Sequence, residues 1–143
     1  MKRYIALLLL IIPLARSSNT APTRIEVHAL PSHTTIGGTV DYVASVFQSS
    51  DVITASLTLT ITARLSNISL ETTPTSDCNT RNDDVRVIIS CTVSSSPTVI
   101  VARGTVLGGT AQMITITGDL DGVIARDVQW VAGVKTVYLP MLP

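Results

Sequence analysis

Two cysteines, Cys78 and Cys91, are the residues of this sequence with the widest chemical range. A thiolate can bind a metal, attack a substrate or pair with a second thiol. A zinc site needs about four ligands, and the two histidines, His28 and His33, lie far upstream without ligand spacing. In an exported chain, an even number of cysteines favours a disulfide over a metal site or a nucleophile. The interpretation therefore depends on whether the chain leaves the cytoplasm.

A serine hydrolase is the second chemistry to consider, because Ser, His and Asp are all present. The sequence has no Gly-x-Ser-x-Gly motif, and neither histidine sits in a recognisable catalytic frame. We interpret His28 as an exposed strand residue and His33 as a loop residue. Asp119 and Asp121 resemble the start of a calcium loop, but the downstream Glu is absent, and Asp121-Gly122 is a common hairpin turn. We therefore expect no catalytic residue, no bound metal and no cofactor.

Aromatic side chains can stack against sugar rings, but the sequence has only one Trp, three Tyr and one Phe. Tyr4 lies near the N-terminus, Tyr42 faces the core in the expected strand register, and Phe47 falls at a strand end. Trp130 and Tyr138 remain as the candidates for stacking against a ligand.

The first 17 residues have the layout of a secretory signal peptide. A cationic head, Met1 to Arg3, precedes the apolar run Ile5 to Leu14, and polar residues follow at once. The run is shorter than the roughly 20 apolar residues that a membrane-spanning helix needs. We expect cleavage after Ser17, which leaves residues 18–143 as a secreted domain without a spanning segment. A buried N-terminal helix or strand is the alternative. Export makes a disulfide between the two cysteines the expected pairing.

The composition favours a β domain and argues against nucleic acid as a partner. Of 143 residues, 45% are hydrophobic and 14% are charged, and ten basic side chains balance ten acidic ones. Phosphate binding needs a basic excess, which this chain lacks. Fourteen serines and twenty threonines accompany many Val and Ile residues, a mixture typical of strands. The length fits one domain.

Alternation of apolar and polar residues predicts strands along the whole expected mature chain. The clearest strand spans 55–63, with Leu57, Leu59 and Ile61 inward and Thr58, Thr60 and Thr62 outward. The other expected strands span 24–30, 39–47, about 68–70, 85–93, 98–106, 111–117 and 123–131, with polar turns between them, including 79–84. In the strand 85–93, both Val85 and Cys91 are expected to point inward. About seven to nine strands without a helical period predict an immunoglobulin-like antiparallel β-sandwich.

Residues 24 to about 118 resemble a bacterial conserved-repeat domain of unknown function, an immunoglobulin-like module of secreted and surface proteins. The resemblance rests on the turn and strand Gly37 to Tyr42, on the strand Ala55 to Ile61 with its alternating Thr, and on Cys78 with the strand Val87 to Val93. Family members often place two cysteines in this last region.

The sequence also departs from the pattern of that family. Gln48 to Asp51 replaces the usual Asn-x-Gly turn, and Arg64 to Ser66 replaces the usual Leu-Pro. The resemblance implies a structural or adhesive module without catalysis.

Together these features predict a secreted, non-enzymatic, structural or adhesive module of a bacterial cell surface, with a protein or glycan as its partner. A small carbohydrate-binding module that uses Trp130 is the alternative, and a secreted hydrolase is a distant third. The apolar, proline-interrupted segment Val137 to Pro143 is expected to pack as a last edge strand or to act as a short docking segment.

Overall fold

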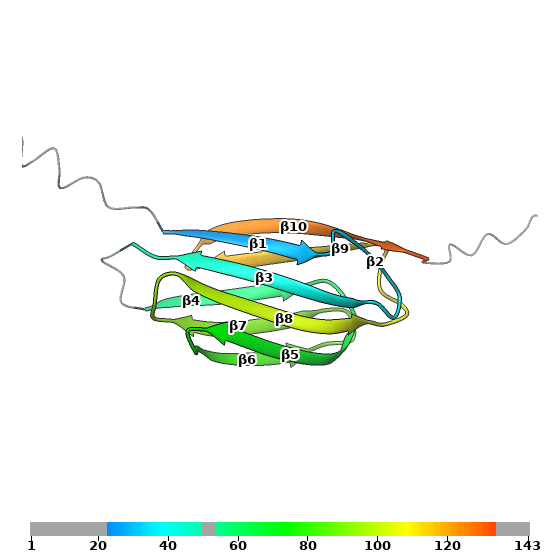
Figure 1. Ribbon diagram of the computed structural model, residues 1–143, viewed down its shortest axis with the longest axis horizontal. Helices are drawn as coiled ribbons and strands as arrows, with labels where there is room; N and C mark the ends of the chain where they lie inside the picture. Colours follow the sequence, from blue (N-terminus) through cyan, green and yellow to red (C-terminus); the bar gives the residue numbers. More distant parts are fainter. Residues whose placement is uncertain (1–22, 50–53, 134–143) are drawn as a thin grey trace, which may run out of the picture.

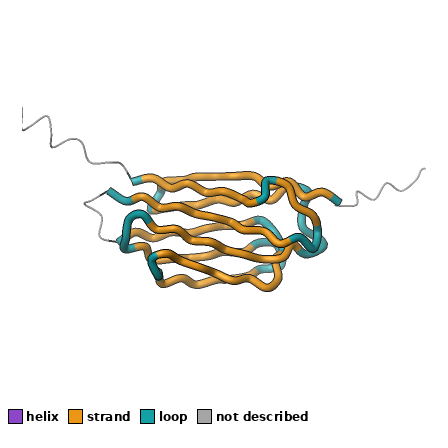
Figure 2. Tube along the Cα trace, viewed as in Figure 1, coloured by secondary structure: helices purple, strands orange, loops and turns teal. Residues whose placement is uncertain are grey.

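A computed structural model describes residues 23–49 and 54–133, and within these ranges the chain forms strands and loops only (Figures 1 and 2). Two sheets pack face to face as an immunoglobulin-like β-sandwich, which confirms the predicted fold class. One sheet has the order β1-β3-β8-β5 and the other β2-β10-β9-β4-β7-β6. The strands are β1 (Arg24–Leu30), β2 (His33–Thr35), β3 (Thr39–Phe47), β4 (Ala55–Ile61), β5 (Leu65–Thr73), β6 (Asp77–Asn82), β7 (Val87–Val93), β8 (Thr98–Val106), β9 (Met113–Leu120) and β10 (Val123–Ala132).

Along strand β4, the alternation of apolar and polar residues matches the alternation of buried and more exposed side chains. The side chains of Leu57, Leu59 and Ile61 are fully buried, whereas Thr58 and Thr60 are half-buried on the opposite face. Thr62, just beyond the end of the strand, is exposed. The predicted register of this strand is confirmed, because a one-residue slip would exchange the two faces.

The strand that contains Cys91 begins later than predicted. Val85 was expected to point inward, but it lies in a turn and is 69% exposed. The turn forms because the N–H of Asp83 donates a hydrogen bond to the carbonyl oxygen of Arg86, at 2.9 Å. Strand β7 therefore starts only at Val87.

The two short edge strands also differ from the prediction. Residues 79–84 were expected to be a turn, yet β6 continues to Asn82 as the outermost strand of its sheet. An edge strand faces solvent and can be polar along its whole length. His33 was expected in a loop, but it lies in β2, which pairs in parallel with β10. The sandwich is therefore not wholly antiparallel.

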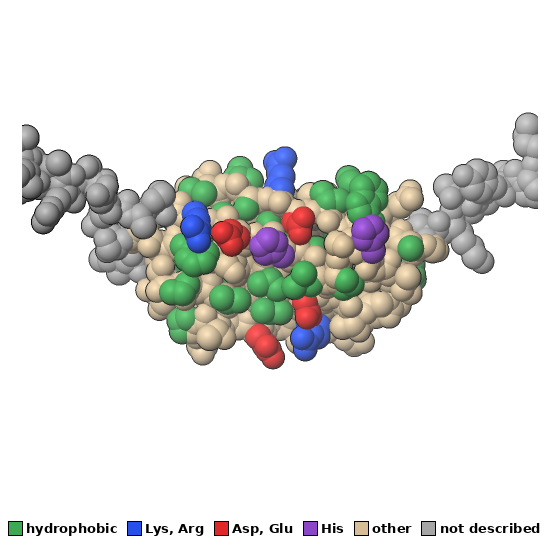
Figure 3. Space-filling view, turned by 45° about the horizontal axis from the view of Figure 1, so that its top comes forward, with side chains coloured by type: hydrophobic (Ala, Val, Ile, Leu, Met, Phe, Trp, Pro, Cys, Tyr) green, Lys and Arg blue, Asp and Glu red, His purple; other side chains and the backbone are tan. Residues whose placement is uncertain are grey.

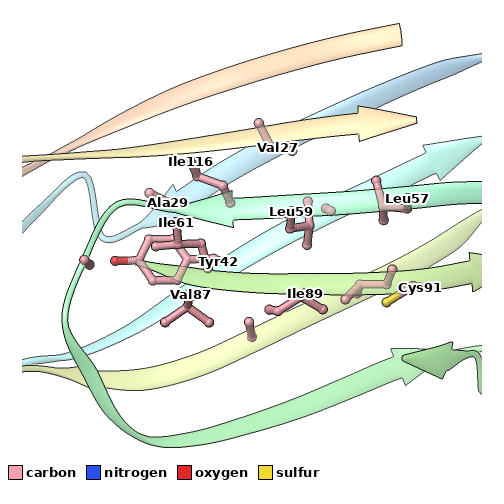
Figure 4. Packing of buried hydrophobic residues seen from close by; sticks show 14 of the residues in the cluster. Val27, Ala29, Tyr42, Leu57, Leu59, Ile61, Val87, Ile89, Cys91 and Ile116 are labelled. Atoms are coloured by element: carbon pink, nitrogen blue, oxygen red, sulfur yellow. The ribbon is translucent and has the colours of Figure 1, made fainter. Parts of the chain in front are cut away.

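The core fills the space between the two sheets with aliphatic side chains and one tyrosine (Figure 4). Gly118 on β9 permits close packing there. A Cβ atom at this position would lie 2.6 Å from Cδ1 of Ile25 and 2.9 Å from Cγ1 of Val27. Strand β1 can therefore approach β9 closely only because residue 118 has no side chain.

The hairpin between β9 and β10 turns at Asp121 and Gly122, as predicted. Both residues have positive φ angles, 46° and 91°, which is the requirement of the tightest hairpin turns. The carboxylate of Asp119 accepts a hydrogen bond from the N–H of Gly122, at 2.8 Å. This hairpin fixes which side chains of β10 face the core.

Candidate functional site

Strand β10 turns polar side chains toward the core and large apolar side chains toward solvent, the reverse of the usual arrangement. Its inward positions hold Ala125, Asp127, Gln129 and Val131, and its outward positions hold Ile124, Arg126, Val128 and Trp130. Gln129 is fully buried, whereas the neighbouring Trp130 is 48% exposed. Because burial of apolar surface drives folding, an ordinary strand of this composition would face the other way.

Hydrogen bonds to the inward polar groups account for this orientation. The amide oxygen Oε1 of Gln129 accepts a bond of 2.8 Å from the hydroxyl of Tyr42, and Nε2 donates one of 2.6 Å to the carbonyl oxygen of Pro31. The carboxylate of Asp127 accepts a bond of 2.8 Å from the N–H of Ala29 on β1. In the described part of the chain every buried side-chain N or O atom has a partner. The reversed strand is therefore satisfied in its polar contacts.

Burial also determines the ionisation of Tyr42. Its side chain lies in the core between the two sheets (Figure 4), and this desolvation raises the pKa of the Tyr42 hydroxyl well above its usual range. The neutral hydroxyl can therefore act as a donor to Gln129 at every physiological pH.

The outward side chains near the C-terminal end of β10 belong to an apolar surface on the outer face of the six-stranded sheet. We call it the Trp130 face and define it as Trp130, Val128, Met113 and Val85. Trp130 lies directly opposite Met113 on β9, and Met113 and Val85 line one open depression of about 220 Å³. The exposed fractions are 48% for Trp130, 44% for Met113 and 36% for Val128.

The depression beside Met113 is formed by three connections and the start of β9. Its lining residues are Thr62, Ala63, Arg64, Val85, Gly109, Thr110, Ala111 and Met113. Arg64 lines the depression, and its guanidinium donates a hydrogen bond to the carbonyl oxygen of Gly108 at 2.8 Å. The lining also holds four apolar side chains that an apolar side chain of a partner could contact, those of Ala63, Val85, Ala111 and Met113.

Of the two residues that the sequence singled out for stacking, Trp130 is partly exposed on the outer face of its sheet. Tyr138 lies outside the described residues. Sequence reasoning missed Met113 and Val128, and it placed Val85 in the core. The apolar outward positions of β10 are a signal that could have indicated the surface, because they break the polar-out rule of a half-exposed strand.

The predicted disulfide between Cys78 and Cys91 is confirmed. The two residues are directly paired on β6 and β7, their Cα atoms lie 4.1 Å apart, and the described chain has no free cysteine. Cys91 points into the core as expected. The bridge joins the edge strand β6 covalently to the sheet, so its role is structural.

The two histidines lie on different sheets, His28 on β1 and His33 on β2. His28 is exposed on β1, as predicted. The hydroxyl of Ser32 lies 3.1 Å from Nδ1 of His33, and this pair is exposed. Among the residues that the structure describes, no three His, Cys, Asp or Glu side chains gather as metal ligands. Across residues 23–49 and 54–133, no helix has the length and apolar character needed to cross a bilayer.

Charged side chains are scattered over the visible surface, with acidic and basic groups interspersed (Figure 3). The guanidinium of Arg103 donates two hydrogen bonds to Asp41, at 2.7 and 3.1 Å. This contact holds the pKa of the Asp41 carboxyl below its usual value.

Comparisons with known proteins do not show a family for this chain. No family model matches the chain, and no curated protein matches its sequence. The resemblance to the conserved-repeat domain therefore stays a prediction.

Three solved structures illustrate the fold. A non-cellulosomal cohesin from the archaeon Archaeoglobus fulgidus is 12% identical with a TM-score of 0.47, over 78% of this chain and 91% of that one. AvmM, which catalyses macrocyclization in alchivemycin A biosynthesis, is 10% identical with a TM-score of 0.44, over 78% and 92%. A collagen-binding domain of a Staphylococcus aureus adhesin is 11% identical with a TM-score of 0.44, over 79% and 99%. These three proteins differ in function, and the likeness concerns the fold alone.

Proposed function

We propose that this chain is a secreted, non-enzymatic, structural or adhesive module of a bacterial cell surface. In this proposal residues 1–17 direct export and residues 18–143 form one immunoglobulin-like domain. The observation that carries it is the reversed polarity of β10, which turns Val128 and Trp130 outward while Gln129 is buried. Exposed apolar surface of this kind marks a site of contact with another molecule.

Strand β1 begins at one end of the long axis of the sandwich and β10 ends at the other (Figure 1). The disulfide adds a covalent connection suited to an oxidising compartment.

A carbohydrate-binding module is the second candidate, and one observation favours it. The indole of Trp130 is half-exposed on an outer sheet face, where a sugar ring could stack. Trp130 lies opposite Met113 on β9 and opposite the exposed His33 on β2, and of these two neighbours only His33 offers a hydrogen bond to a sugar hydroxyl. This environment favours an apolar polypeptide over a glycan as the partner.

Retention on cells tests the adhesive role. Exported protein is incubated with washed bacterial cells, and the retained fraction is compared between the wild type, Trp130→Ser and Leu30→Ser. Leu30 is a matched control because it is 52% exposed on β1, in the other sheet. We expect only Trp130→Ser to lower retention. Equal retention of all three proteins would contradict the proposal.

Two further assays separate the alternatives. If the wild type binds a glycan array and Trp130→Ser abolishes this binding, the chain is a carbohydrate-binding module. Turnover of generic ester or peptide substrates that Ser32→Ala or His33→Ala removes would establish a hydrolase and overturn the non-enzymatic proposal. N-terminal sequencing of exported protein tests the signal peptide, and we expect a start near residue 18.

A further inference from the structure

We propose that strand β6 binds a second copy of this chain, with the two β6 strands paired antiparallel so that Asp77 of each copy faces Arg81 of the other. This contact joins the two six-stranded sheets into one continuous sheet. The inference goes beyond the proposed function, because β6 lies at the edge of its sheet opposite to β2 and β10 (Figure 1).

Of the four described strands at sheet edges, three carry a feature that hinders pairing with another chain. Strand β2 has only three residues, and β5 has a bulge between Ser66 and Ser69. On β1, the carboxylate of Asp127 accepts the hydrogen bond that the N–H of Ala29 donates. Strand β6 pairs with β7 over six consecutive residues without a shift, and it contains no Pro, Gly or Lys. In the described part of the chain, β6 is therefore the regular edge that remains open to pairing.

The backbone groups of Cys78 and Thr80 point away from the sheet. Cys78 and Cys91 lie directly opposite each other with their Cα atoms 4.1 Å apart, the short spacing of a non-hydrogen-bonded pair. In such a pair, the N–H and C=O groups of each residue are directed away from the neighbouring strand. Because this pattern repeats every two residues, Thr80 and Asn82 have the same orientation as Cys78. The outer edge of β6 thus presents a row of donors and acceptors to solvent.

Charge selects one register among those that the backbone allows. With Asn79 at the twofold axis, Cys78 of each copy pairs with Thr80 of the other through backbone hydrogen bonds. Asp77 then lies directly opposite Arg81 on both sides of the axis, and opposite charges in such positions attract. Moving the axis to Thr80 places Arg81 opposite the neutral Asn79. Moving it to Arg81 places two arginines opposite each other, which is unfavourable.

Both charged side chains are accessible for this contact. Asp77 and Arg81 are exposed, and among the described residues no basic side chain lies within ion-pair distance of Asp77. Arg81 lies 3.7 Å from the carboxylate of Asp83, but Arg86 contacts the same carboxylate at 3.4 Å. Asp83 therefore keeps a cation when Arg81 turns toward the second copy.

Exchange of the two charges tests the pairing and its register together. Monomer and dimer are measured by sedimentation equilibrium of the exported protein up to about 1 mM, because short edge contacts are weak. We expect a dimer in the wild type and dimerisation about tenfold weaker or more in Asp77→Arg and in Arg81→Asp, which place like charges opposite each other. The double variant Asp77→Arg with Arg81→Asp should restore the dimer. A monomeric wild type, or a double variant no better than the single ones, would overturn the proposal.

Matched controls separate this contact from an effect of net charge. Glu26→Arg and Arg24→Asp change the net charge by the same amounts, at exposed positions of β1 in the other sheet. We expect both control variants to dimerise like the wild type. Equal weakening in the control variants and in the β6 variants would show a general charge effect and contradict the proposal.

A backbone variant tests the edge without changing any charge. Thr80→Pro removes an N–H that points away from β7, so pairing within the molecule is kept while the second copy loses a donor. We expect Thr80→Pro to be a monomer with the circular dichroism of the wild type, and a dimer of wild-type strength would overturn the proposal. If the variant is unfolded, the charge exchange decides. None of these variants changes the Trp130 face, so the result is separate from that of the cell-retention assay.

Discussion

The hydroxyl of Tyr42 on β3 donates a 2.8 Å hydrogen bond to Oε1 of Gln129 on β10, so one buried polar contact joins the two sheets. The same glutamine donates to the carbonyl oxygen of Pro31. Gln129 is thereby fixed inward, and Trp130, one residue later, must point outward because successive side chains of a strand alternate. The exposed surface is therefore a consequence of a buried hydrogen bond.

Alkaline pH should weaken the fold through Tyr42. Burial raises the pKa of its hydroxyl, so the unfolded chain loses this proton first as pH increases. The stabilisation is fully present below about pH 10 and declines above it. Urea denaturation between pH 8 and pH 11 should show a falling free energy of unfolding, with a weaker decline in Tyr42→Phe. The same decline in both proteins would show that Tyr42 is not its source.

Strand β4 should be sensitive on one face only. Leu59→Ala removes a fully buried side chain and should cost about 2 to 5 kcal/mol of unfolding free energy. Thr60→Ala changes a half-buried position on the opposite face and should cost less than about 1 kcal/mol. Urea denaturation measures both. A larger cost for Thr60→Ala would mean that the register of β4 is reversed.

The disulfide should contribute strongly to stability. It closes a loop with a sequence separation of 13, for which constraint of the unfolded chain corresponds to about 3 kcal/mol. The double variant Cys78→Ser with Cys91→Ser should lose about that amount in thermal or urea unfolding. Thiol titration of the denatured, unreduced wild type should find no free thiol. Two reactive thiols per chain would contradict the bridge.

Gly118 should tolerate no side chain. An added Cβ would meet Ile25 and Val27 at less than 3 Å, and overpacking of this kind costs about 1 to 3 kcal/mol. Gly108→Ala is the matched control, because a Cβ there meets nothing within 4 Å. A difference in melting temperature between the two variants measures the effect. Equal melting temperatures would show that β1 and β9 can move apart without cost.

The sequence predicted the features that depend on local pattern. The faces of β4, the inward position of Tyr42 and the turn at Asp121-Gly122 follow from a period of two and from turn chemistry. The inward Cys91 and an exported chain led to the disulfide. These features need no knowledge of which strands become neighbours.

The features that depend on pairing between distant strands were not predictable in the same way. Strand β6 is polar, and only its pairing with β7 and its edge position explain it. The outward position of Val128 depends on partners that lie about 90 residues earlier, because Gln129 bonds with Tyr42 and Pro31. A single strand pattern cannot show that polar residues at 127 and 129 have buried partners.

The orientation of β10 places Gln129 in the core and Trp130 at the surface, and truncation of these two adjacent residues tests it. Gln129→Ala leaves the Tyr42 hydroxyl and the Pro31 carbonyl without their partner and should cost about 1 to 3 kcal/mol in urea denaturation. Trp130→Ala removes a larger side chain that is 48% exposed, and we expect it to cost less free energy of unfolding than Gln129→Ala. A larger loss for Trp130→Ala than for Gln129→Ala would place the indole in the core and contradict the reversed strand.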